Sequence, residues 1–560
     1  MTMLEVLLKP AAHPIPFVLC LLPVVVLAVH VVPYLVDEHG LRQYPGPFLA
    51  KFTDFWLFWV ASKSRRTDAI DKLHQKYGPF VRIAPNHISV VSPEAVSAVY
   101  GHSTGTTKSA FYDAFVALRA VRGMFNTRSR TEHARKRRVM AHMFSPQSVR
   151  TFEGPVKGHI QTLLNQLDLM CSKVGAKDEV KTGTLGSSIW EVRGGYVWFN
   201  VQFWCNLFTF DVIGELAFGS PFGMLLRGQD TVRIAKSPAA GIASYALTDS
   251  AAKQPAAQYE VEEIAAIELI TARTETNAVP AVLPVYMREF MRRMPQFRRS
   301  TKSLGQIIGM AADVVSRRLA AARQEGNDEK IFDDMFGKLL NGRDENGNPM
   351  TPQELTTETI TLLIAGSDTT SNSLSAMIFY IARDQKVQKK LQAELDAAAS
   401  ADTTSILPFD DAKSLPYLEA VINEGLRLFS PVGLGLGRVV PESGITVLGQ
   451  TFLAGTEISV PLYSVHHLEE AWGADVEEYR PERWLNAEKR GEMMKAFNPF
   501  SFGPRACIGR NVAMLEMTLV IAAVFRRYDI VLQPGEMLEV YDSFVRKPHK
   551  CVVGIKRREI

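Results

Sequence analysis

Cys507 lies in a glycine-rich segment whose residues could hold a metal cofactor. The segment runs Phe500-Ser501-Phe502-Gly503-Pro504-Arg505-Ala506-Cys507-Ile508-Gly509-Arg510, and an apolar, helix-like run from Asn511 to Phe525 follows it. Glycines let the backbone come close to a flat cofactor, and the N-terminal end of a helix favours a thiolate. A thiolate bound to haem iron favours cleavage of the O–O bond of dioxygen. We therefore expect Cys507 to bind haem iron and Arg505 to pair with a haem propionate.

A buried structural cysteine is the alternative interpretation of Cys507, and for an isolated cysteine it would be preferred. Here the types and spacing of Phe500, Gly503, Arg505 and Gly509 around the sulfur argue against it. Phe500 and Gly509 are accordingly expected to lie beside the cofactor. The other four cysteines, at positions 20, 171, 205 and 551, are too scattered for a disulfide framework and are expected to be free thiols.

A second group with catalytic potential is Asp368 with Thr369, in the segment Leu362-Leu363-Ile364-Ala365-Gly366-Ser367-Asp368-Thr369-Thr370. The surrounding stretch is apolar nearly all round, which is typical of a buried helix, so its polar residues need a reason. A carboxylate beside a hydroxyl offers a path for protons. The alternative is that the hydroxyls bond back to the preceding turn and kink the helix, which is common. Both interpretations hold together if a kink at Gly366 makes room beside a proton-supplying pair.

The composition is that of a globular protein with a large core. The chain has 560 residues, of which 46% are hydrophobic and 22% charged, with a net charge of +4. These values exclude a disordered chain and a polytopic membrane protein, and they give no reason to expect nucleic-acid binding.

The N-terminal residues predict a membrane anchor. No charged side chain occurs between Lys9 and Asp37, and the apolar stretch from Ile15 to Val36 could span a bilayer. A cleaved signal peptide is the alternative, but its apolar part should be shorter. More basic residues follow the stretch than precede it, which places the body in the cytosol; they are Arg42, Lys51, Lys63, Arg65 and Arg66. Residues 1–44 are thus expected to be anchor and flank, and residues 45–560, after Pro45-Gly46-Pro47, one domain.

That domain is predicted to be mostly α-helical with small β-sheets, an α+β fold. Helical spacing covers residues 131–144, 354–384, 384–399 and 415–429, with Thr351-Pro352 and Glu354 opening one of them. Strand patterns predict a hairpin of Phe80–Ile83 with Ile88–Val91, a pairing of residues 530–532 with 551–555, and a third set near Ile445 to Val460.

The Cys507 segment resembles the haem-binding signature of the cytochrome P450 family, and other family motifs occur in the same order. Glu424-Gly425-Leu426-Arg427 is similar to the family's Glu-x-x-Arg, and Pro481-Glu482-Arg483-Trp484 to the segment that completes its ion network. The resemblance implies haem b bound through Cys507, a monooxygenase reaction with Asp368 and Thr369 as catalytic residues, and a buried structural role for Glu424, Arg427 and Arg483. It also implies electrons from NADPH through NADPH–cytochrome P450 reductase, and the endoplasmic reticulum membrane.

The same resemblance suggests further propionate-binding residues. His133 and Arg137, one helical turn apart, are similar to residues of the family's helix that binds a propionate, although many relatives carry tryptophan where His133 stands. Arg438 resembles another propionate arginine. The neighbouring charges Arg135, Lys136 and Arg138 are expected to form a solvated face, which the resemblance makes a docking surface for the reductase.

Longer stretches are similar to the fungal benzoate 4-monooxygenases within that family; they are Phe210 to Leu225, Ala365 to Asn372 and Ala496 to Phe500. This implies para-hydroxylation of benzoate or a related small aromatic acid. The substrate loops of the family fall at Thr106 to Met124, with Phe111, Tyr112, Phe115, Arg119 and Arg122, and at Pro431 to Gly437. Oxidation of another phenolic or fungal metabolite is the alternative. A non-catalytic membrane haem-binding protein is a third possibility, which Asp368 and Thr369 argue against.

Overall fold

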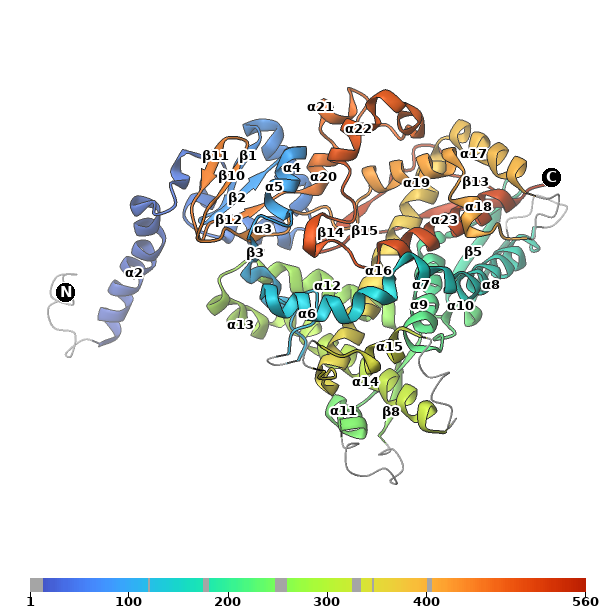
Figure 1. The fold of residues 1–560 in the computed structure, drawn as a ribbon, viewed down its shortest axis with the longest axis horizontal. Coiled ribbons are helices and arrows are strands. Elements are labelled where there is room, and N and C mark those ends of the chain that lie inside the picture. The colour runs from blue at the N-terminus through green and yellow to red at the C-terminus, as the bar shows by residue number, and fades with distance from the viewer. Residues whose placement is uncertain are drawn as a thin grey trace.

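The computed structural model describes residues 14–118, 121–174, 181–246, 259–324, 334–344, 347–399 and 405–559. Most of these residues form helices gathered into a body of roughly triangular outline, with α2 projecting beyond one corner (Figure 1). The helices are α2 Pro14–Val36, α3 Phe55–Ser62, α4 Arg66–Tyr77, α5 Pro93–Tyr100, α6 Arg130–Ala141, α7 Pro146–Thr151, α8 Glu153–Cys171, α9 Val201–Phe218, α10 Met224–Arg227, α11 Pro238–Ala246, α12 Ala266–Ala281, α13 Val285–Arg293, α14 Arg298–Gln324, α15 Met335–Asn341, α16 Pro352–Arg383, α17 Gln385–Ala398, α18 Phe409–Ala412, α19 Pro416–Leu428, α20 Leu462–His466, α21 Glu469–Trp472, α22 Ala487–Ala496 and α23 Arg510–Arg527.

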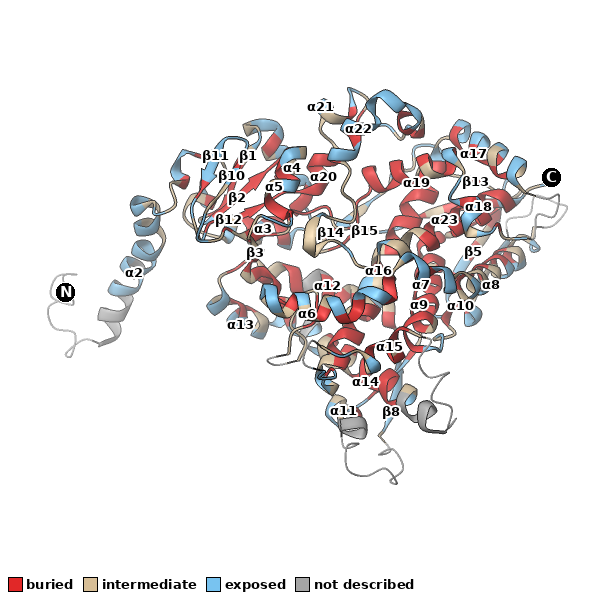
Figure 2. Cartoon of the chain, viewed as in Figure 1, coloured by how far each residue is buried: buried red, intermediate tan, exposed pale blue. Residues whose placement is uncertain are grey.

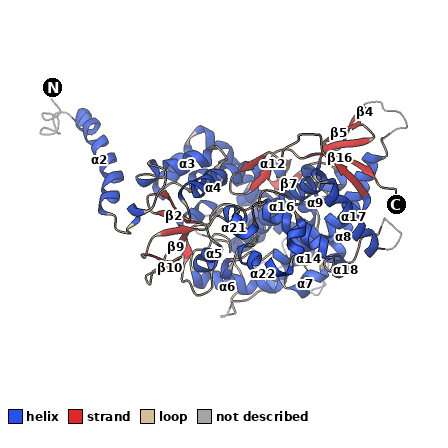
Figure 3. Ribbon diagram, turned by 90° about the horizontal axis from the view of Figure 1, so that it is seen from above, coloured by secondary structure: helices blue, strands red, loops and turns tan. Residues whose placement is uncertain are grey.

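Two five-stranded sheets lie at opposite ends of the body, with helices between them (Figure 3). The first has the strand order β1-β2-β12-β9-β3 and the second the order β13-β16-β6-β5-β4. The strands are β1 Phe80–Ala84, β2 His87–Val90, β3 Thr107–Lys108, β4 Lys181–Leu185, β5 Ser188–Arg193, β6 Tyr196–Asn200, β7 Val232–Ala235, β8 Val261–Ile264, β9 Arg438–Val439, β10 Ile445–Val447, β11 Gln450–Phe452, β12 Glu457–Ser459, β13 Tyr528–Val531, β14 Val540–Asp542, β15 Arg546–Pro548 and β16 Val552–Arg557.

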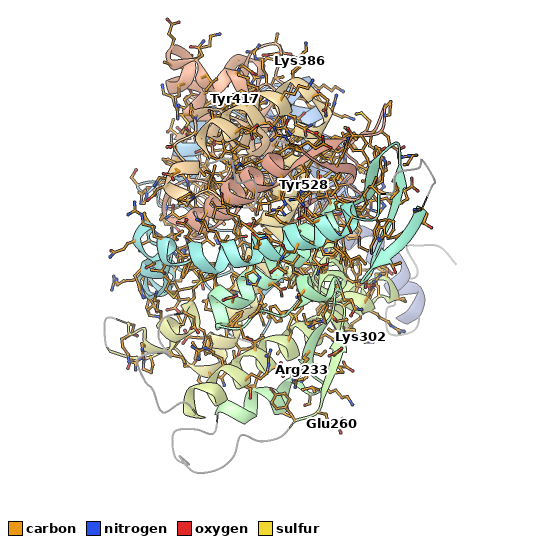
Figure 4. All side chains as sticks on the ribbon, turned by 90° about the vertical axis from the view of Figure 1, so that its right-hand side faces the viewer. Arg233, Glu260, Lys302, Lys386, Tyr417 and Tyr528 are labelled. Atoms are coloured by element: carbon orange, nitrogen blue, oxygen red, sulfur yellow. The ribbon has the colours of Figure 1, made fainter. Side chains whose placement is uncertain are left out.

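The predicted mostly helical fold with small sheets is confirmed. The β1–β2 hairpin, the antiparallel pairing of β13 with β16 and the strands between residues 445 and 459 all form as expected. The strands β4, β5 and β6, in residues 181–200, extend the second sheet and were not predicted from the sequence. The antiparallel pair of β7 and β8 was also not predicted. It lies near Arg233 and Glu260, at the end of the molecule away from Lys386 and Tyr417 (Figure 4).

The core is built around α16, which runs through the middle of the molecule beside α9, α14, α19 and α23 (Figures 1 and 2). Thr351 begins the helix with a capping box, because its hydroxyl accepts the Glu354 N–H while the Glu354 carboxylate accepts the Thr351 N–H. Gly366 faces α9, and a Cβ there would lie 2.8 Å from Ile213 Cδ1. The absence of a side chain at Gly366 therefore allows α9 and α16 to approach each other closely.

The N-terminal segment forms α2, whose described side chains are mainly apolar and exposed, among them Leu22, Leu27 and Val36. Across the described part of the chain, no helix combines the length and the hydropathy needed to cross a bilayer. Lys9 and the other residues of 1–13 lie outside the described residues. Packing of the body reaches back beyond Pro45, because Leu41 and Tyr44 are buried in the core around β2 and α5.

Candidate active site

The Cys507 loop lies directly before α23 and is held by its own backbone. The Cys507 N–H donates to the carbonyl of Phe500 at 2.9 Å, and the Ala506 N–H donates to Gly503 at 3.0 Å. Gly503 has φ +73°, and a Cβ there would lie 2.0 Å from the carbonyl oxygen of Tyr100. Gly503 is thus required by contact with the end of α5, whereas the sequence had suggested only an approach to the cofactor. Gly509 is less constrained, since its Cβ would lie 4.0 Å from Cys507 Sγ.

Opposing effects act on the Cys507 thiol. Desolvation raises its pKa, while the N–H groups of Gly509 and Arg510 and the charge of Arg137 lower it. The side chain is nevertheless exposed. An accessible thiol close to the positive charge of Arg137 is an environment in which a cysteine can act as a metal ligand.

One face of α16 is also not packed against protein. Ala365 is exposed and Thr369 partly exposed, although Leu363 and Ser367, on neighbouring positions of this central helix, are fully buried. The Thr369 hydroxyl donates to the carbonyl of Ala365 at 2.8 Å. This bond to the preceding turn is the structural alternative that the sequence also suggested for Thr369. It leaves the hydroxyl on the accessible face, as a role in proton transfer also requires.

Asp368 is 4% exposed and lies beside Thr369 in sequence. Its carboxylate is 3.4 Å from Asn372 Nδ2, on the next turn of α16, and 3.5 Å from Lys547 Nζ, on β15. Lys547 could not be predicted as a neighbour of Asp368, because it lies 179 positions away and belongs to no motif.

Five basic side chains from four parts of the chain gather near the Cys507 loop. Three of them are half-buried or buried and held by backbone carbonyls: Arg137 donates to Ala506, Arg505 to Thr127, Arg128 and Ser129, and Arg438 to Leu436 and Gly437. The other two are His133 and Lys108, which are 6% and 5% exposed. The structure therefore brings together all four predicted propionate residues and adds Lys108, for which the sequence offered no motif.

The charges in this cluster repel one another. Desolvation and the neighbouring positive charges together lower the pKa of His133 to about 3; these charges belong to Arg505, Lys108, Arg137 and Arg438. Desolvation and the neighbouring arginines likewise hold the pKa of Lys108 well below its usual value. An anion bound among these groups would relieve the repulsion. The two propionates of a haem are carboxylates that fit this requirement, so both the accessible sulfur and the cationic cluster suit haem.

Phe500 is partly buried at the edge of the main core, and the guanidinium of Arg510 lies 5.7 Å from its ring centroid.

The prediction of a solvated face on α6 is wrong for Lys136. It is 2% exposed and pairs with Glu354 at 2.9 Å, so it fastens α6 to the start of α16. Arg135 also pairs with Glu354. Of the three neighbouring charges, Arg138 is the exposed one.

The predicted structural network around Glu424 is confirmed. Glu424 and Arg427 are fully buried on α19, and their side chains form two bonds of 2.8 and 3.0 Å. Arg483 Nε and Trp484 Nε1 each donate to the same carboxylate at 2.9 Å. Arg427 also donates to the carbonyl of His466. Every charge in this network is paired, as buried charges must be.

The predicted substrate loop contributes an aromatic cluster to the body. Phe111 and Phe115 contact Phe544, from the turn between β14 and β15, with ring centroids 6.3 and 4.9 Å apart. Phe125 and Tyr112 complete the cluster. Arg122 pairs with Asp113 at 2.7 Å. Arg119, the other arginine of this stretch, lies outside the described residues.

Comparison with known proteins gives a consistent result. The sequence model of the family described as cytochrome P450 matches residues 45–554. The chain is 37% identical to benzoate 4-monooxygenase bphA of Aspergillus niger over 534 residues, which cover 95% of each chain. It is 27% identical to cytochrome P450 monooxygenase cicH of Emericella nidulans, over 92% of this chain and 94% of that one. It is also 27% identical to tryprostatin B 6-hydroxylase of Neosartorya fischeri, over 93% of this chain and 83% of that one.

Proposed function

The chain belongs to the cytochrome P450 family, and from this we propose that it hydroxylates benzoate or a related small aromatic acid at the para position. The main support for this substrate class is the 37% identity to a benzoate 4-monooxygenase over 95% of both chains. The aromatic cluster of Phe111, Phe115, Phe125 and Phe544 supports it, because flat rings favour contact with other rings. The balanced reaction consumes one ArH, O2, NADPH and H⁺ and releases ArOH, water and NADP⁺.

The residues divide the work of this reaction. Haem b, when bound, supplies an iron whose thiolate ligand favours O–O cleavage. Cys507 provides that thiolate, and the N–H groups of Gly509 and Arg510 favour its charged form. His133, Arg137, Arg438 and Arg505 hold the propionates, with Phe500 and Gly509 beside the cofactor. Thr369, on the accessible face of α16, and the buried Asp368 beside it supply protons; without them, O2, NADPH and H⁺ end as hydrogen peroxide and NADP⁺.

Spectroscopy of the purified full-length holoenzyme tests this function. The reduced carbon-monoxide complex should have the strongly red-shifted Soret band of a thiolate-bound haem. Titration with benzoate should shift the iron from low to high spin as water leaves it, and turnover should yield 4-hydroxybenzoate. Cyclohexanecarboxylate, which keeps the carboxylate and lacks the aromatic ring, is the matched control and should bind more weakly. No spin shift at saturating benzoate would remove this substrate and favour another phenolic or fungal metabolite.

We also propose that residues 1–44 anchor the chain in the endoplasmic reticulum membrane, with residues 45–560 forming the haem domain in the cytosol. The exposed apolar side chains of α2 support this, as does a second set of large apolar residues on the body. That set comprises Phe48, Trp59, Tyr286 and Phe290, which are between 59% and 72% exposed. Removal of residues 1–36, which spares the buried Leu41 and Tyr44, should release the protein from membranes while the carbon-monoxide spectrum persists.

The redox partner proposed is NADPH–cytochrome P450 reductase, an acidic flavoprotein. Because Lys136 is buried in ion pairs, docking must rely on other basic residues, such as the exposed Arg138. Raising the ionic strength should slow reductase-dependent turnover, since salt screens attraction between exposed charges. Arg138→Glu should slow it at low salt. Turnover that is insensitive to both changes would rule out this docking surface.

A further inference from the structure

Lys547 lies where three distant parts of the chain meet beside the catalytic pair. It belongs to β15, in the hairpin near the C-terminus, and its ammonium donates to Thr271 Oγ1 on α12 at 2.6 Å. The same nitrogen lies 3.5 Å from Asp368 Oδ1 on α16. The side chain of Lys547 is 14% exposed, so this bridge is formed largely inside the protein.

Asp368 depends on this lysine for its charge balance. Within the described residues, its carboxylate contacts the Lys547 ammonium at 3.5 Å and the Asn372 amide at 3.4 Å. A buried carboxylate that lacks a nearby cation carries a large desolvation cost. Both contacts are longer than the 2.7–2.9 Å typical of strong charge-assisted hydrogen bonds. The carboxylate is therefore compensated but not tightly fixed, as a group that must gain and release protons requires.

The position of the ammonium is set from outside α16. Thr271 holds Lys547 by a bond 0.9 Å shorter than the contact with Asp368, the difference between 3.5 and 2.6 Å. The aromatic cluster at Phe544 fixes the turn of the same hairpin against Phe111 and Phe115. A movement of α12 or of the hairpin would consequently carry the ammonium toward or away from Asp368.

We propose that Lys547 is a positioning residue for proton delivery: anchored on Thr271, it sets the place of the Asp368 carboxylate relative to Thr369. Proton delivery would then be efficient only while α12 and the β14–β15 hairpin are held against α16. This inference rests on the proposed role of Asp368 in the monooxygenase reaction. It adds a residue from the far end of the chain that no motif identifies.

Substitution of Lys547 in the full-length holoenzyme tests the proposal. Lys547→Met keeps the length of the side chain and removes its charge. The product formed per NADPH consumed should fall by roughly tenfold and hydrogen peroxide should rise in its place, since positioned proton transfer contributes on the order of 100-fold or more. The Kd for benzoate, measured by calorimetry, should stay within about twofold, which is under 0.5 kcal/mol. Lys547→Arg should restore most of the coupling, and Thr271→Val should lower it in the same direction.

The matched control is Lys550→Met, which removes an exposed lysine three residues farther along the chain and should leave coupling unchanged. The carbon-monoxide spectrum and the melting temperature show whether each variant is folded. A fully coupled Lys547→Met enzyme would overturn the proposal. So would a variant that loses benzoate affinity and keeps its coupling, because Lys547 would then bind the substrate carboxylate.

Asp368→Asn separates this inference from the proposed function. If Asp368→Asn remains fully coupled, the assigned role of Asp368 fails, and the Lys547 proposal fails with it. If Asp368→Asn is uncoupled while Lys547→Met is not, only the Lys547 proposal fails. Uncoupling in both variants, with rescue by Lys547→Arg, supports both.

Discussion

At the scale of single residues, the two glycines that flank Cys507 have different tasks. Gly503 has a left-handed backbone conformation and touches the carbonyl of Tyr100, while Gly509 has space beside the sulfur. The first glycine joins the cofactor loop to α5. The second leaves room near the Cys507 sulfur.

Gly503→Ala should lower the free energy of unfolding by roughly 2–4 kcal/mol, because the new Cβ meets backbone that has to move and the conformation disfavours alanine. Gly509→Ala should change it by less than about 1 kcal/mol. Denaturant unfolding of the two holoproteins measures this difference. Equal losses at both positions would contradict the assigned contact with Tyr100.

Thr369→Ala removes the hydroxyl that the accessible face of α16 presents. We expect haem to remain bound and the product formed per NADPH to fall by roughly tenfold, with hydrogen peroxide rising in step. Thr369→Ser keeps a hydroxyl and should stay mostly coupled. If the yield per NADPH is the same in Thr369→Ala as in the unchanged enzyme, the threonine has no part in proton delivery.

At the scale of secondary-structure elements, the Glu424 network determines where α19 lies relative to the segments before the Cys507 loop. Glu424 receives bonds from α19 itself and from the 3₁₀ helix Pro481–Leu485. Arg427 extends the network to the end of α20. His466 on α20 then accepts the N–H of Asn498, just before the cofactor loop. The loop is thus positioned by a chain of buried polar contacts.

Glu424→Ala would leave two buried arginines without their shared carboxylate. Breaking a buried pair in this way costs about 3–5 kcal/mol, so we expect a large drop in melting temperature. Lys390→Met breaks the exposed pair with Glu482 and serves as the control, with an expected loss below about 1 kcal/mol. Glu424→Gln, which keeps the shape, should lie between them. A Glu424→Ala protein as stable as the control would exclude a structural role.

At the scale of the whole molecule, buried imidazoles make stability depend on pH. Burial lowers the pKa of His74 to about 4 and that of His466 to about 3. Such an imidazole binds its proton less tightly in the folded protein than in the unfolded chain, so stability is complete above pH 6.5 and falls as the pH drops toward the folded value. Glu358 acts in the opposite direction, because burial raises its pKa to about 7 and the folded state keeps a proton that the unfolded state releases.

His74→Gln isolates one of these contributions. His74 bonds Gly78 and Ser89 and contacts no residue of the proposed site, so the variant should keep its haem. The difference in unfolding free energy between the unchanged protein and the variant should shrink by up to about 1.4 kcal/mol per pH unit from pH 6.5 down to about 4. Urea unfolding at several pH values measures it. Parallel curves over that range would show that His74 does not titrate in this window.

Local pattern and family resemblance were enough to predict the features that depend on neighbouring residues. The helices containing Asp368 and Glu424 follow from apolar periodicity and capping residues, and Cys507, His133, Arg137, Arg438 and Arg505 were found from motifs. These features are carried by neighbours within a few residues, so they can be read along the chain.

The contacts between residues far apart in the chain, by contrast, became visible in the folded structure. Lys108 lies among the basic side chains near the Cys507 loop, Lys136 pairs with Glu354, and Lys547 contacts Asp368 from 179 positions away. The tertiary structure also decided that Gly366 faces Ile213 and Gly503 faces Tyr100. The physical reason is that burial and charge compensation are properties of the packed interior. The residues next to a lysine in the sequence do not determine whether its ammonium lies in water or against a buried carboxylate. The packing of distant segments determines this.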